Sequence, residues 1–154
     1  MAKKIKIDID FNQDNSLIGI SCHKKDYWAA FQLNDLLHIN LRRFDNLFVY
    51  KTQQDIQLSY PLFYYSDTDS LINYYFFSNH NQEGKLFPSQ KSIDYFLLIN
   101  GMMDDEALQN LVSQVRSKPG IIAAYKLDLK KIKNYQDFLT DLELYMMEIK
   151  QSKK

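Results

Sequence analysis

The segment IDYFLLIN, Ile93 to Asn100, constrains the fold of this chain more than any other stretch. It is apolar at nearly every position, which is typical of an interior strand with both faces buried. The residues that follow predict a helix with Asp104 or Asp105 near its N-terminus, where negative charge favours the helix dipole. Lys118-Pro119-Gly120 ends this helix, and Ile121 to Asp128 predicts another strand. Strand, helix and strand together predict a βαβ unit.

The N-terminal two thirds of the chain predict further strands. Lys4 to Phe11 alternates isoleucine with charged residues, which indicates a strand with one wet face. Three aromatic-rich strand candidates follow, at about 41–51, 56–65 and 71–79, and the polar turn SDTDS between the last two predicts a hairpin. The short apolar segment Ser16 to Ser21 is either a strand or the packed start of the next helix.

A helix is predicted from about Lys24 to His38. Its main apolar stripe consists of Ala29, Ala30, Leu33, Leu36 and Leu37. Tyr27, Trp28 and Phe31 project from a different side at helical spacing. A helix that is apolar on two sides is either sandwiched inside its domain or used at an interface, so these three aromatic residues are interface candidates.

The last predicted helix runs from about Asn134 to Lys150. Its stripe has 3-4-3-4 spacing, at Tyr135, Phe138, Leu142, Tyr145 and Ile149. Docking on its own domain is favoured over a coiled-coil dimer, because two heptads are short. We therefore expect a single α+β domain over 1–133, with residues 134–154 forming an amphipathic helix that docks on it or serves association. The class is an antiparallel-rich sheet with helices on one face, ferredoxin-like in outline, with a terminal βαβ unit.

Composition bounds the function classes. The 154 residues fit one domain. Lys plus Arg and Asp plus Glu both number 19, so the chain lacks the basic excess that a nonspecific nucleic-acid binder needs. The single cysteine, Cys22, excludes an intramolecular disulfide. The chain shows no signal segment and no apolar run of about 18 residues, which favours a cytoplasmic protein with no membrane partner.

No catalytic or metal-binding motif stands out. None of the three histidines has a second His or a Cys at metal-ligand spacing, so we expect no metal and no cofactor. His23 with Asp26 could form a base and its orienting acid, but capping of the helix start is the favoured interpretation. His80 lies in a polar turn and reads as a solvated loop residue. The sequence leans away from an enzyme.

Asp94 is the most informative polar residue, because it opens the apolar strand. A carboxylate there must be paired or hydrogen-bonded. One interpretation is that it accepts backbone N–H groups from the loop 88–91 and fastens that loop to the strand. The other is that Pro88, Lys91, Asp94 and Tyr95 line a small binding site at the sheet edge. Local satisfaction of buried polar groups favours the fastening.

FPSQKSIDY, Phe87 to Tyr95, resembles the signature of the IPExxxVDY family, small proteins of the Bacteroidota with no assigned activity. Pro88, Asp94 and Tyr95 match the pattern, and Phe87 and Ile93 are apolar replacements. Ser89 stands where the family has glutamate. The resemblance extends to segments such as SLIGIS and AAYKLD, and it implies lineage and a cytoplasmic location.

Together these observations predict a non-enzymatic cytoplasmic protein that binds a protein partner or itself, as a homodimer. The alternative is a regulatory domain that binds a small molecule at the sheet edge.

Overall fold

A computed structural model describes residues 15–51, 55–80 and 84–152 of the chain. The strand predicted at Lys4 to Phe11 lies outside the described residues. The elements are, in chain order, β1 (Asn15–Cys22), α1 (Asp26–Leu37), β2 (Arg42–Lys51), β3 (Ile56–Asp67), β4 (Ile72–Ser78), β5 (Tyr95–Asn100), α2 (Asp105–Ser117), β6 (Ile121–Leu127), the short 3-10 helix η2 (Leu129–Lys131) and α3 (Tyr135–Ser152).

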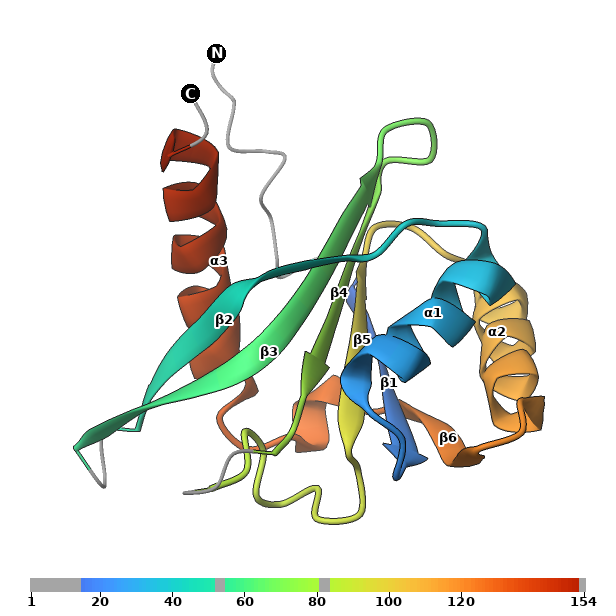
Figure 1. The fold of residues 1–154 in the computed structure, drawn as a ribbon, viewed down its shortest axis with the longest axis horizontal. Helices are drawn as coiled ribbons and strands as arrows, with labels where there is room; N and C mark the ends of the chain where they lie inside the picture. The colour runs from blue at the N-terminus through green and yellow to red at the C-terminus, as the bar shows by residue number, and fades with distance from the viewer. Residues whose placement is uncertain (1–14, 52–54, 81–83, 153–154) are drawn as a thin grey trace.

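The strands form one six-stranded sheet in the order β2-β3-β4-β5-β1-β6 (Figure 1). Every neighbouring pair in it is antiparallel. The predicted α+β class with an antiparallel-rich sheet is therefore confirmed. Residues 16–21, for which the sequence left two alternatives, belong to strand β1.

β5 lies in the interior of the sheet, between β4 and β1, and all of its residues are buried. Phe96 and Leu98 face one layer of the core, and Leu97 and Ile99 face the other. β5 and β6 are both antiparallel to β1, so they run parallel to each other. The predicted βαβ unit is present, with β1 inserted between its two strands.

Helices cover both faces of the sheet (Figure 1). α1 and α2 pack on one face, where Leu33 and Leu111 share a cluster with Leu97. α3 packs on the opposite face, where the rings of Phe138 and Phe77 lie 4.8 Å apart. The sequence predicted helices on one face of the sheet only. The structure differs, because α3 covers the opposite face and makes a third layer.

The β2–β3 hairpin contains a bulge whose cause is visible in the sequence. Phe44 is opposite Leu62 and Leu47 is opposite Tyr60, so two residues of β2 face Pro61. Proline has no N–H to donate to a ladder, and a bulge on the neighbouring strand accommodates it. Beyond the bulge the pairing is regular from Leu47 to Lys51.

Candidate functional site

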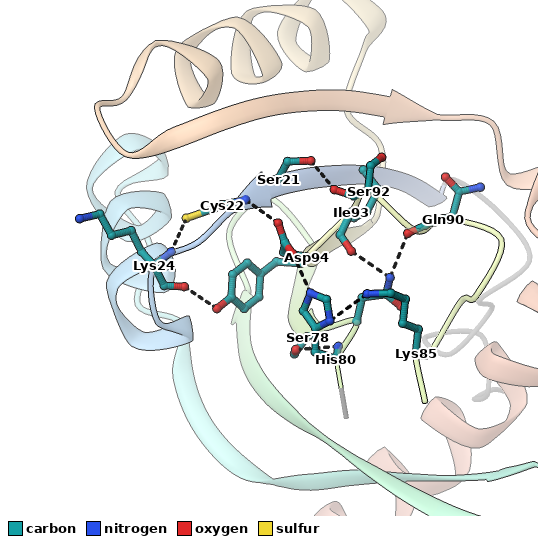
Figure 2. A network of polar contacts seen from close by, with 12 residues as sticks. Ser21, Cys22, Lys24, Ser78, His80, Lys85, Gln90, Ser92, Ile93 and Asp94 are labelled. Atoms are coloured by element: carbon teal, nitrogen blue, oxygen red, sulfur yellow. Dashed lines mark hydrogen bonds and ion pairs between the residues drawn. The ribbon is translucent and has the colours of Figure 1, made fainter. Parts of the chain in front are cut away.

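Asp94 ties three strands together at the start of β5 (Figure 2). Its Oδ2 accepts a hydrogen bond of 2.8 Å from the backbone N–H of Cys22 at the end of β1. Its own N–H donates to Ile20, and its carbonyl accepts from the N–H of Asn79 just after β4. The side chain is 18% exposed. Asp94 is therefore a fastening, but its side chain holds β1 and not the loop 88–91 that the sequence suggested.

The second oxygen of the Asp94 carboxylate bonds to the side chain of His80. Its Nε2 lies 2.6 Å from Asp94 Oδ1, and Lys85 Nζ lies 3.0 Å from its Nδ1 (Figure 2). A lysine ammonium can only donate, so Nδ1 accepts and Nε2 carries the proton that faces Asp94. His80 is exposed in the loop after β4, as predicted, but its bond to Asp94 was not expected. His80 and Asp94 are fourteen residues apart in the sequence, and no local pattern indicated this contact.

Tyr95, whose side chain lies on the other face of β5, also bonds to the segment that follows β1. Its hydroxyl donates to the carbonyl of Lys24 at 2.7 Å, and its ring stacks on Phe76 with centroids 5.3 Å apart. Burial is the main cause that raises the pKa of Tyr95 above its ordinary value. The hydroxyl therefore stays protonated and serves as a donor that holds the β1–α1 connection.

The Cys22 thiol lies inside this network without being activated. It is buried, and its Sγ accepts from the N–H of Lys24 at 3.3 Å. Burial raises the pKa of the thiol, and the nearby Asp94 carboxylate raises it further, while the Lys24 N–H opposes them in part. Because the thiolate is the nucleophilic form, Cys22 has the character of a structural cysteine.

The loop between β4 and β5 is held by Asn79, which is fully buried. Its Nδ2 donates to the carbonyls of Gln90 and Ile93 at 3.1 and 2.9 Å, and its Oδ1 accepts from the N–H of Phe87 at 2.8 Å. Sequence reasoning placed Asn79 in a polar turn and missed this role. The signal available was an asparagine at a strand end, a residue whose amide commonly bonds nearby backbone.

The four residues predicted to line a binding site differ in the contacts that they make. Asp94 and Tyr95 both bond to the end of β1 and the start of α1. Pro88 and Lys91 are exposed on the loop, and within the described residues no hydrogen bond or ion pair joins either of them to Asp94 or Tyr95. The apolar signature position Phe87 is buried, with its ring 5.1 Å from that of Phe96. The contacts of Asp94, Tyr95 and Phe87 thus have structural roles.

The described residues offer little for catalysis or metal binding. They contain no group of three or more His, Cys, Asp or Glu side chains that could hold a metal ion. His23 is exposed, and the carboxylate of Asp26 accepts from the N–H of Tyr27. Within the described residues, His23 and Asp26 are not hydrogen-bonded to each other as a base and its orienting acid would be.

The aromatic residues of α1 divide into two groups. Trp28 is half-buried, lies beside Gly120 and carries Lys24 Nζ at 5.8 Å from its ring centroid. Tyr27 and Phe31 are each 67% exposed. They lie one turn apart on a single face of the helix and form the α1 surface. Of the three predicted interface residues, these two present free apolar area.

Comparison with protein-family models and with curated proteins finds no match to this chain. The IPExxxVDY resemblance therefore stays a prediction. Among the described residues, no helix is both long enough and apolar enough to cross a membrane.

Proposed function

We propose that this protein acts by binding another protein chain through the α1 surface, Tyr27 and Phe31, and not by catalysis. The observation that carries the proposal is the exposure of these two rings beside a fully formed core. The buried stripe of α1, with Ala29, Ala30 and Leu33, already satisfies the packing of the helix. The sheet does not need Tyr27 or Phe31, so their exposed area is available to a partner.

Aromatic side chains are enriched at protein interfaces because they bury much area and lose few rotamers. A pair on adjacent turns of a rigid helix is a typical anchor for a partner. The small-molecule alternative has weaker support, because both oxygens of the Asp94 carboxylate bond within the chain and the Tyr95 hydroxyl does too.

A photoreactive residue tests the proposal. With p-benzoylphenylalanine in place of Phe31, irradiation of cells that make the protein should produce a covalent adduct between the chain and a protein. The matched control carries the same residue in place of Gln114, which is exposed on α2. An adduct from position 31 that is absent from position 114 supports a docking surface. Equal yields at both positions, or none at position 31, would reject it.

A further inference from the structure

A second exposed aromatic pair lies on the β2–β3 hairpin. Phe48 and Tyr50, here called the hairpin surface, are 53% and 50% exposed. They alternate along β2 with Leu47 and Val49, which belong to the cluster beneath α3. Since successive strand residues point to opposite faces, Phe48 and Tyr50 lie on the face of the sheet that carries α1 and α2.

The described helices leave uncovered the face of the hairpin that carries Phe48 and Tyr50. In Figure 1 the far end of the hairpin reaches away from α1 and α2. Tyr27 and Phe31 therefore do not cover Phe48 and Tyr50 within one chain, as the exposure of all four rings shows. The molecule carries two separate aromatic surfaces on the same side of its sheet.

We infer that the partner is a second copy of this chain, with the α1 surface of each copy packed on the hairpin surface of the other. The inference rests on the proposed function and names its partner. A single two-fold axis can pair two different surfaces of a molecule reciprocally, so that each contact occurs twice in a closed dimer.

The exposed rings supply part of the area that a dimer interface needs. An aromatic side chain buries 150–250 Å² when fully covered, so four half-exposed rings per copy supply roughly 800 Å² in the pair. That is about half of the ~1,600 Å² of a standard interface, so the four rings correspond to a weak dimer that forms at high protein concentration. The chain has equal numbers of basic and acidic residues, 19 of each, so no net charge keeps two copies apart.

Pairing of the β2 edges is a poorer alternative route to a dimer. The bulge opposite Pro61 interrupts the first half of the strand, where Arg42 and Arg43 also lie. The carbonyl of Asp45 within the bulge already accepts from the Tyr145 hydroxyl of α3. Bulges and charged residues are common devices that block edge-to-edge pairing. A face-to-helix contact is therefore favoured over strand addition.

Light scattering of the purified full chain over a range of concentrations tests the inference. The wild-type mass should reach that of two chains. Phe31→Asp and Phe48→Lys should each weaken the dimer by at least tenfold, because each change damages both contacts. An equimolar mixture of the two variants should restore the dimer, since the mixed pair keeps one intact contact and sets the introduced acid against the introduced base. Met102→Asp, at a residue 81% exposed outside both surfaces, should leave the mass unchanged.

The outcomes separate this inference from the function on which it rests. A wild-type mass of one chain at all concentrations, or a mixture of variants that stays monomeric, overturns the reciprocal dimer. A dimer that is lost in Phe31→Asp but not recovered in the mixture indicates a different contact, such as α1 on α1, and also overturns it. If position 31 forms an adduct with a different protein while the purified chain is monomeric, the docking function stands and the second copy does not. Circular dichroism confirms that each variant is folded.

Discussion

The Nδ2 of Asn79 lies 2.9 Å from the carbonyl oxygen of Ile93, fourteen residues later in the chain. This contact closes the loop that connects β4 to β5. The same side chain also holds Gln90 and Phe87, so one buried amide organises the backbone from 86 to 93. The order of residues 86–93 therefore depends on one residue at the start of the same loop.

Asn79→Ala should lower the free energy of unfolding by about 3 kcal/mol, because it leaves buried backbone groups of the loop without partners. Chemical denaturation measures the change. Ser89→Ala, at an exposed position of the same loop, is the control and should stay within about 0.5 kcal/mol of the wild type. Equal stability of the two variants would show that the amide does not hold the loop.

Asp94→Ala should lower the free energy of unfolding by about 2 kcal/mol, because the Cys22 N–H loses its acceptor. Asp94→Asn should recover more than half of this loss, since its amide oxygen can still accept from Cys22. Thermal unfolding of both variants checks this order of stabilities. Lys91→Ala, at an exposed neighbouring residue, is the control. A variant Asp94→Ala as stable as Lys91→Ala would contradict the fastening role.

Cys22 should be unreactive toward thiol reagents in the folded protein. Burial raises the pKa of its thiol and also blocks access to the sulfur. Reaction rates measured with and without denaturant should differ strongly, and the signal is unambiguous because the chain has one cysteine. Rapid labelling of one thiol per chain in native buffer would be inconsistent with this environment.

Buried tyrosines should destabilise the protein in alkali. Burial raises the pKa of Tyr60 and of Tyr135 to about 12, from an ordinary value of 10.0. Below pH 10 both states keep these protons. Between about 10 and 12 the unfolded chain loses protons that the folded chain retains, so the free energy of unfolding falls as pH rises through this window.

Unfolding measured by chemical denaturation at several alkaline pH values checks this slope. Tyr60→Phe should make it shallower, because that variant has one fewer hydroxyl to ionise on unfolding. A slope unchanged by Tyr60→Phe would mean that this hydroxyl titrates alike in both states.

Gly120→Ala should destabilise the protein by about 1–3 kcal/mol. Gly120 has a φ of +98°, and an added Cβ would lie 2.7 Å from Cη2 of Trp28. Gly84→Ala is the matched control, since its added Cβ would meet only Leu58 Cδ1 at 3.4 Å. Thermal unfolding compares the stabilities of the two variants, and Gly120→Ala should have the lower melting temperature. If Gly120→Ala were the more stable of the pair, the close approach of Trp28 would not be the constraint inferred here.

The elements of the fold were accessible from the sequence because their signals are local. The period of the apolar residues places α2, and Asp104 caps it by accepting from the N–H of Ala107. The continuous apolar run places β5 in the sheet interior. The side on which α3 docks was not accessible. An amphipathic stripe shows that a helix packs, but the face it packs on depends on which side of the distant strands is bare.

The candidate site was less accessible, because its contacts are between residues far apart in the chain. A carboxylate at the head of an apolar strand predicts that Asp94 is bonded. Its donor is the backbone of Cys22, 72 residues earlier, and no local pattern identifies such a partner. His80 and Asn79 have the same difficulty, since a polar turn in the sequence looks alike whether its side chains point into solvent or into the core.

The insertion of β1 between β5 and β6 has a consequence for how the chain is made. β1 leaves the ribosome before the other described strands, yet its partners at 95–100 and 121–127 leave among the last. The side-chain contact between Asn100 and Asn15 spans 85 residues. The β5-β1-β6 part of the sheet therefore cannot form until residues 95–127 have been synthesised. Contacts of such long range slow folding, and the apolar β1 strand has to wait unpaired during translation.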